Sequence, residues 1–138
     1  MATLVDQLLK ADVKKASELK VGTFPSKRLA KILGKEESVE IQIKEIPARK
    51  LNDLSTYQYD KKGNQDISKG FDARLLVCVE GIVEPSMKDK ELQEHFGCAT
   101  PKDLAEKIFG GESIGIADAI ANLSDYVSDE DVEDELKN

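Results

Sequence analysis

The feature that most constrains the fold is one apolar run, FDARLLVCVEGIVEP, at residues 71–85. It is the apolar centre of the sequence, so we expect it at the centre of the core. Its β-branched residues permit a buried strand, but its span of about a dozen residues, with Glu80 and Gly81 inside it, favours a buried helix. We predict the helix and keep the strand as the alternative. A chain of 138 residues with 40% apolar side chains supports one modest core, so residues 1–124 are expected to form a single domain.

A first short helix is predicted near the amino terminus. Thr3 and Asp6 have the spacing of a capping box, in which each side chain bonds the backbone of the other residue. The apolar residues that follow at helical spacing are Leu4, Val5, Leu8 and Leu9.

Four segments of different character separate this helix from the central run. Residues 11–34 read as a loop or an edge strand, because glycine and proline interrupt them. Residues 38–46 alternate apolar and polar side chains, which predicts a strand with one solvated face, ended by Pro47. A short helix is predicted over residues 48–59, and a mobile polar loop over residues 61–70.

The carboxyl-terminal part predicts a cluster of three helices. Two capped helices meet at a glycine turn within ELQEHFGCATPKDLAEKIF, residues 91–109. A third helix over residues 113–127 places Ile116, Ile120, Leu123 and Val127 on one face. The predicted capping and terminating residues are Ser86, Asp89, Gly97, Thr100, Pro101 and Asp103. The predicted fold class is therefore α+β: a mostly helical single domain with a small β element near residues 38–46 and a C-terminal helical cluster.

The only histidine, His95, lies three residues before Cys98, which raises the question of a reactive site. The end of a helix accounts for His95, because a cationic side chain there interacts favourably with the helix dipole. A catalytic dyad would need an orienting third group, and a structural zinc site about four ligands, whereas the chain has one His and two Cys. Cys78 lies in the apolar run and reads as a buried, reduced thiol. We predict no catalytic, cofactor-binding or metal-binding residue.

Neither nucleic acid nor a membrane is predicted as a partner. The second capped helix balances Lys102 and Lys107 against Asp103 and Glu106, so no basic stripe is available to neutralise phosphates. No run of about 18 apolar residues exists, and the start of the chain lacks the order of a secretion signal. We therefore expect a cytoplasmic protein.

The net charge of −7 belongs almost wholly to the end of the chain. Residues 112–138 carry nine acidic residues against the single Lys137, a balance of −8. A like-charged block with so little apolar content cannot offset the entropy cost of ordering, so residues 125–138 are expected to form a flexible acidic tail. A solubilising role is favoured over that of a docking peptide.

The order of these segments resembles the XkdN-like tail assembly chaperones of phages and prophages. The resemblance runs from LLKADVKK through KRLAKILG to the Ile-rich helix and the acidic end, and its most specific part is residues 80–109. It implies a non-enzymatic protein that is made during tail morphogenesis in a bacterial host and is absent from the finished virion. The implied partner is the tape measure protein, a long helical chain that must stay unaggregated until the tail tube encloses it.

Two other functions stay open at this point. One is a structural or adaptor component of the phage tail, and the other is a thiol-dependent enzyme using Cys98. The resemblance assigns no individual binding residue, but we expect the helices of residues 86–124 to line the contact with a client. A chaperone of a helical client needs an amphipathic groove and a solubilising charge rather than a reactive centre.

Overall fold

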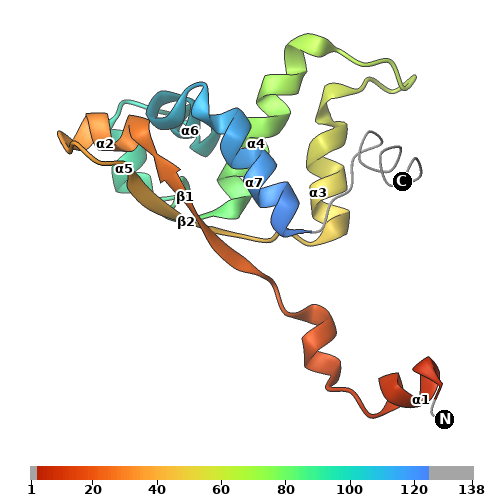
Figure 1. Cartoon of the computed structure of the whole chain (residues 1–138). Coiled ribbons are helices and arrows are strands. Elements are labelled where there is room, and N and C mark those ends of the chain that lie inside the picture. The colour runs from red at the N-terminus through yellow and green to blue at the C-terminus, as the bar shows by residue number, and fades with distance from the viewer. Residues whose placement is uncertain (1–2, 125–138) are drawn as a thin grey trace, which may run out of the picture.

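The computed structural model describes residues 3–124, which form helices around a small antiparallel sheet (Figure 1). The predicted α+β class is confirmed. The α-helices of these residues are α1 (Leu4–Leu9), α2 (Lys27–Leu33), α3 (Ala48–Ser55), α4 (Gly70–Gly81), α5 (Lys90–His95), α6 (Pro101–Phe109) and α7 (Glu112–Leu123). The strands are β1 (Val21–Ser26), β2 (Val39–Lys44) and β3 (Ile82–Glu84), and short 3-10 turns are η1 (Val13–Ser17), η2 (Thr56–Gln58) and η3 (Ile67–Lys69).

The central apolar run forms α4, as predicted, and this helix is the hub of the core. α3, α6 and α7 all pack against it, and Leu75 and Cys78 on it are buried. The helix ends at Gly81, four residues before the end of the predicted one, and the chain continues as β3. Pairing of Ile82 with Ile43 of β2 explains the early end, because the last residues of the run complete the sheet. The helix prediction is therefore correct for the part of the run in Gly70–Gly81, and the strand alternative for Ile82–Glu84.

The sheet has the strand order β1-β2-β3, with both pairs antiparallel. The predicted alternation in β2 is confirmed, since Ile41 and Ile43 are buried while Glu40 and Gln42 are exposed. β1 is an edge strand, which is one of the two predicted alternatives for its segment. α7 lies against this strand, and Leu123 occupies the space above the strand's glycine.

Helix α2 was missed in the sequence, where residues 11–34 were expected to contain only a loop or strand. Ser26 caps it, its Oγ accepting a hydrogen bond of 3.0 Å from the Leu29 amide. Glu112 of α7 adds a cap from a distant part of the chain. Its carboxylate accepts hydrogen bonds from Ser26 Oγ at 2.6 Å, Lys27 N at 2.8 Å and Arg28 N at 3.3 Å. The start of α2 is therefore stabilised largely by a residue 85 positions away.

The cap of α5 differs from the prediction. Ser86 does not cap it, because its Oγ accepts a hydrogen bond of 3.2 Å from the Lys88 amide within a turn. Asp89 is the N-cap instead, and its carboxylate accepts a hydrogen bond of 2.9 Å from the Leu92 amide. Gly97 follows the helix in the left-handed conformation, with φ of 70°.

Helices α6 and α7 complete the cluster. Thr100 caps α6, its Oγ1 accepting a hydrogen bond of 3.1 Å from the Asp103 amide, and Pro101 occupies the first turn. In α7 the predicted face is buried at Ile116 and Ile120, and the helix ends at Leu123. The remainder of the predicted stripe, at Val127, lies outside the described residues, as does the predicted acidic tail of residues 125–138.

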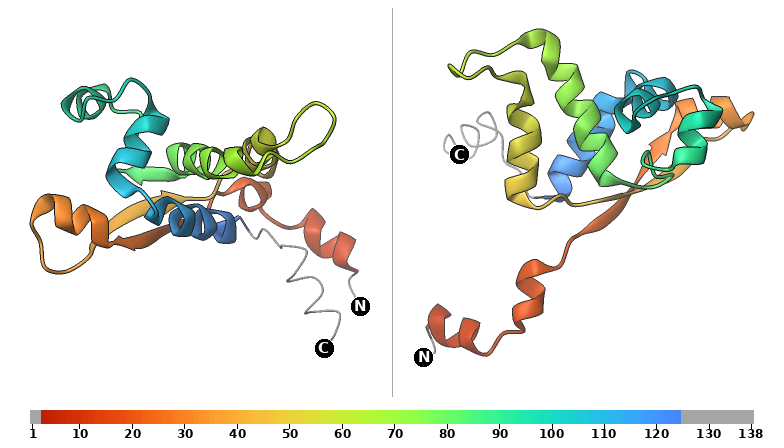
Figure 2. Two further views of the ribbon diagram at one scale, coloured as in Figure 1. Left: turned by 90° about the horizontal axis from the view of Figure 1, so that it is seen from above. Right: turned by 180° about the vertical axis from the view of Figure 1, so that it is seen from behind.

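Residues 3–20, which we call the N-terminal arm, extend away from the rest of the molecule (Figures 1 and 2). None of them is buried. The predicted capping box of α1 is confirmed, with hydrogen bonds of 3.1 Å from Thr3 N to Asp6 Oδ2 and 3.2 Å from Asp6 N to Thr3 Oγ1. The arm meets the sheet at Lys20, whose backbone exchanges hydrogen bonds with Glu45.

Candidate partner-binding surfaces

The N-terminal arm presents apolar side chains to solvent. The apolar residues of α1 were expected at helical spacing and lie there, but 76% of Leu4 and 80% of Leu9 is exposed. Val13 in η1 is 85% exposed. A helix of six residues without tertiary packing is marginal in water, because the cost of its first turn is not recovered. The arm therefore has the properties of a segment that is stabilised by a partner. Its exposed large apolar residues are Leu4, Val5, Leu8, Leu9, Val13 and Leu19.

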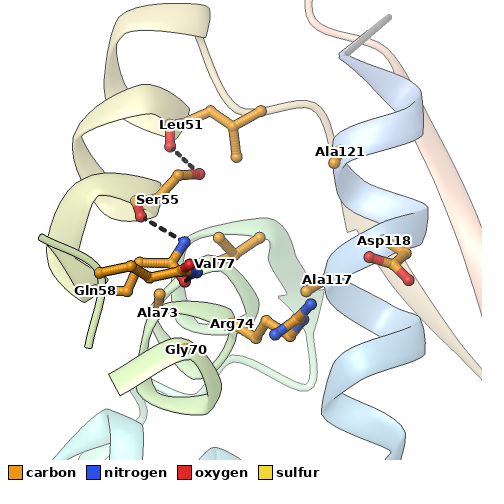
Figure 3. A pocket seen from close by; sticks show the side chains of 11 residues that line it. Leu51, Ser55, Gln58, Gly70, Ala73, Arg74, Val77, Ala117, Asp118 and Ala121 are labelled. Carbon is orange, nitrogen blue, oxygen red and sulfur yellow. Dashed lines mark hydrogen bonds between the residues drawn. The ribbon is translucent and has the colours of Figure 1, made fainter. Parts of the chain in front are cut away.

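A second surface is a groove between α3 and α7, with α4 as its floor (Figure 3). Both outer helices pack on α4, and the space left between them has a volume of about 300 Å³. Leu51 and Ala121 lie at one end, where α7 approaches its last residue. Gln58 and Arg74 lie toward the other end, so the groove changes from apolar to polar along its length. We call this surface the α3–α7 groove.

Hydrogen bonds fix the α3 wall of this groove. Ser55 Oγ donates to the Leu51 carbonyl at 2.8 Å, and Gln58 Nε2 donates to the Ser55 carbonyl at 3.1 Å. Gln65 Nε2 donates to Gln58 Oε1 at 2.9 Å, which joins the loop before α4 to the same wall. The polar side chains of this wall are thus held in place by the protein itself.

Arg74 is the basic residue of the groove and the one basic residue in the central apolar run. Its side chain is exposed, and within residues 3–124 no carboxylate forms an ion pair with it. Asp118 is the acidic residue of the lining and follows Ala117 on α7. The groove therefore offers an unpaired guanidinium beside an apolar surface.

An apolar hollow of about 320 Å³ lies between η2 and the start of α6. Tyr57, Leu76 and Pro101 line it. Lys102 also lines it and pairs with Asp72 at 3.5 Å, and the ammonium group of Lys69 lies 5.9 Å from the centre of the Tyr57 ring. Both cations already have partners, so this hollow lacks the unsatisfied charge of the α3–α7 groove.

The three residues considered for a reactive site are His95, Cys98 and Cys78, and their surroundings differ. The exposed His95 ring packs edge-on against Phe96 with ring centres 5.1 Å apart, and Cys98 Sγ donates to the Phe96 carbonyl at 3.7 Å. Cys78 is fully buried, and this burial raises the pKa of its thiol to about 12. Its Sγ donates to the Ser113 carbonyl at 3.4 Å, so the thiol stays protonated at neutral pH and is a poor nucleophile.

Two further findings concern the described part of the chain. Residues 3–124 contain no group of three or more His, Cys, Asp or Glu side chains that could hold a metal ion. None of the helices in this range combines the length and the apolar character that crossing a bilayer requires.

Sequence comparison identifies the family. Residues 5–137 match the phage XkdN-like tail assembly chaperone proteins. The chain belongs to this family. Membership implies that it works with a protein of the phage tail. No curated protein matches the chain significantly in sequence.

A solved structure shows the same fold. The crystal structure of the protein yqbn superimposes with a TM-score of 0.57 and covers 80% of this chain and 88% of its own. The two sequences are 18% identical, so the likeness concerns the fold alone.

The α3–α7 groove could not be predicted from the sequence, because its walls lie far apart along the chain. One signal was present: Arg74 interrupts a run of apolar residues, and a charged residue at such a position is rarely fully buried. The capping role of Glu112 was also missed, since a carboxylate in a first helical turn is ordinarily explained by its own helix.

Proposed function

We propose that this tail assembly chaperone binds the tape measure protein in the cytoplasm of the bacterial host and keeps it from aggregating until the tail tube forms. It acts as a binding protein, not as an enzyme. Family membership supports a role in tail assembly. The observation that carries the proposal is the N-terminal arm, which presents six large apolar side chains on a segment with no buried residue.

The chemistry of the arm suits a helical client. An amphipathic helix pairs with another through apolar side chains three and four positions apart. α1 has this spacing from Leu4 to Leu8 and from Val5 to both Leu8 and Leu9. Burying one such side chain fully contributes about 1.5–3 kcal/mol, so covering the arm yields on the order of 10 kcal/mol before ordering costs are subtracted. Part of this gain offsets the cost of association, and the remainder contributes to holding a client without a reactive group.

We place the first contact on the arm and not on the helices of residues 86–124 that the sequence suggested. The apolar faces of α6 and α7 are turned into the core, where Leu104, Ile108, Ile116 and Ile120 are buried. Those side chains are therefore occupied by the fold of the chaperone itself.

A non-enzymatic role agrees with the chemistry of the thiols. Cys78 is held protonated by burial. Cys98 hydrogen-bonds a backbone carbonyl, and among the described residues no hydrogen bond links it to His95. We expect Cys98→Ser to leave tail assembly unchanged, whereas loss of infectious tails in this variant would favour a thiol-dependent enzyme.

Co-expression with the tape measure protein of the same phage tests the proposal. The wild-type chain is expected to keep the tape measure protein in the supernatant, and the double variant Leu8→Asp/Leu9→Asp to lose most of this effect. Ile67→Asp is the matched control, because Ile67 is 84% exposed but lies outside the arm. A tape measure protein that is equally insoluble with and without the wild-type chain would refute the proposed function. Equal rescue by the arm variant would refute only the role of the arm.

A further inference from the structure

We propose that two copies of this chain pair through the free edge of β1, as antiparallel strands related by a two-fold axis at Gly22. Within residues 3–124, β1 is hydrogen-bonded to β2 on one side and to no strand on the other. The second copy would turn the two three-stranded sheets into one continuous sheet. The inference concerns the edge strand and does not rest on the identity of the client.

The register of β1 and β2 shows which backbone groups the free edge presents. The Lys20 carbonyl accepts a hydrogen bond of 2.7 Å from the Glu45 amide, so it is directed toward β2. In an antiparallel pair, every second residue bonds the neighbouring strand. Val21 and Thr23 therefore direct their N–H and C=O groups away from β2, toward the free edge.

This edge lacks the usual protection against pairing. Exposed edge strands are commonly guarded by charged side chains or proline. Val21–Ser26 contains no charged residue, and Pro25 stands at an outward position only after Val21 and Thr23. Because Pro25 has no N–H group, it limits the free edge to these two residues without weakening the bonds to β2.

The surface beside the edge is apolar and uncovered. Val21 is 77% exposed, although it is a β-branched residue within a strand. A hollow of about 380 Å³ lies next to it, with Val21 and Thr23 on one side and the exposed Val83 of β3 on another. Unpaired backbone groups and apolar side chains are thus exposed at the same place.

A second copy fits this edge because the edge is complementary to itself. With the axis at Gly22, Val21 of each copy lies opposite Thr23 of the other. Each of these two pairs exchanges two hydrogen bonds, so all the outward groups of both residues are satisfied. Cross-strand pairs of β-branched side chains also stabilise a sheet.

Leu123 supplies an apolar contact at the axis, on the other face of the sheet. Its Cδ2 lies 3.3 Å from the position of a Cβ added to Gly22, and its side chain is half-buried. Opposite residues of this kind bring their Cα atoms to about 4.5 Å, so the two Leu123 side chains would cover each other. α7 also contacts β2 and α4, which places it over the sheet and not beyond the edge.

The charges beyond the paired residues are complementary as well. The same register brings Glu18, whose backbone is extended, level with Ser26 of the second copy. The exposed Lys27 follows Ser26 and forms no ion pair within residues 3–124. Glu112 is the other carboxylate at this place, but its oxygens already accept hydrogen bonds from Ser26 and from amides of α2. The Glu18–Lys27 contacts are exposed, so they favour the register more than they add affinity.

The size of the contact indicates a reversible dimer. A stable interface takes about 20–30 residues per partner, and the paired segment of residues 18–27 is smaller, even with Leu123 added. The pairing is isologous, so it closes at two copies and leads to no fibre. α1 lies outside the paired segment, so self-association and the proposed contact with a client use different residues.

Sedimentation equilibrium of the full chain over a concentration series tests the proposal. The mass is expected to rise from 15.2 kDa toward twice this value. Val21→Lys/Thr23→Lys should keep the chain monomeric, because the introduced ammonium groups would lie opposite each other. Gln42→Lys is the control, since it adds positive charge at an exposed position one strand away from the edge, and it should associate as the wild type does.

A spin label tests the register of the pairing. A nitroxide is attached through Gln42→Cys in a Cys98→Ser background, in which the other thiol, Cys78, is fully buried. Gln42 lies opposite Thr23. In the dimer the two labelled positions are therefore three strand spacings apart and offset by two residues, a separation of about 16 Å. Electron paramagnetic resonance measures this separation.

The expected result is a dipolar interaction at about 16 Å that Val21→Lys/Thr23→Lys abolishes. Amide spectra establish that each variant is folded. A mass of 15.2 kDa at every concentration, equal association of the edge variant, or a much larger label separation would overturn the proposal. Association that Leu8→Asp/Leu9→Asp abolishes and the edge variant retains would also overturn it, because the arms would then join the copies. None of these results decides whether the chain keeps the tape measure protein soluble, so the two proposals fail separately.

Discussion

Replacing Gly81 by alanine tests whether the close packing of α4 on α7 holds the core together. A Cβ at this position would lie 2.5 Å from Cδ1, 2.7 Å from Cγ2 and 2.9 Å from Cγ1 of Ile120. Carbon atoms attract at about 3.5–4.0 Å, so the two helices would have to separate by about 1 Å. Ile120 is fully buried, and its branched side chain has essentially one rotamer in a helix, so it cannot turn away from all three contacts.

The magnitude follows from two opposing effects. Overpacking a core costs about 1–3 kcal/mol. Alanine recovers about 0.5–1 kcal/mol in a helix, because it has less conformational freedom to lose than glycine. We therefore expect Gly81→Ala to lower the free energy of unfolding by about 1–2 kcal/mol, measured by urea denaturation of the full chain.

Two companion variants make this result specific. Gly111→Ala is the matched control, because nothing lies within 4 Å of its added Cβ and its φ of −64° suits alanine. It should be neutral or more stable by up to about 1 kcal/mol. Ile120→Val removes the closest atom, so it should cost less in the Gly81→Ala background than in the wild type. A Gly81→Ala chain as stable as the wild type would show that the packing argument is wrong.

Three further predictions concern single interactions. Glu112→Gln keeps the size of the side chain but removes its charge, so we expect a loss of about 1.5–3 kcal/mol in urea denaturation, and an unchanged stability would contradict the long-range cap of α2. Thr100→Ala should cost about 1 kcal/mol, and a melting temperature equal to that of the wild type would remove its capping role. Because burial raises the pKa of Cys78 to about 12, the unfolded chain releases the thiol proton at lower pH than the folded chain. Stability should therefore fall by about 1.4 kcal/mol per pH unit between roughly pH 9 and 12, relative to Cys78→Ala at the same pH, and parallel pH profiles of the two chains would refute this.

Local signals in the sequence were enough to predict several elements. The alternation in β2 and the buried stripe of α7 follow from side-chain periodicity, which each element carries by itself. The cap at Thr100 lies within four residues of the backbone amide that it bonds. Such features can be predicted because they do not depend on contacts with distant residues.

Elements completed by distant residues were not predictable in the same way. β3 has three residues and exists because β2, about 40 positions earlier, offers it a partner. α2 begins where Glu112 meets its free amides. The N-cap of α5 was also not predicted correctly. Asp and Ser are both good N-caps, and the turn before α5 selects Asp89 instead of Ser86.

The candidate surfaces were the hardest part to predict. The apolar stripe of α1 looks the same in a sequence whether it packs in a core or faces a partner, and the structure leaves it exposed. In the sequence, the apolar stripes of α6 and α7 look equally suitable for binding a client, but in the structure these side chains are buried in the core. The α3–α7 groove depends on the distance between two helices, which periodicity does not encode.

Hydrogen exchange of the chain alone and in complex with the tape measure protein tests the central claim most directly. In the free chain, the amides of residues 3–20 are expected to exchange rapidly, because none of these residues is buried. In the complex, deuterium uptake should fall most in residues 4–19, while the loop around the exposed Ile67 exchanges as before. A stable complex in which the arm exchanges as fast as in the free chain, with protection confined to other segments, would contradict the account.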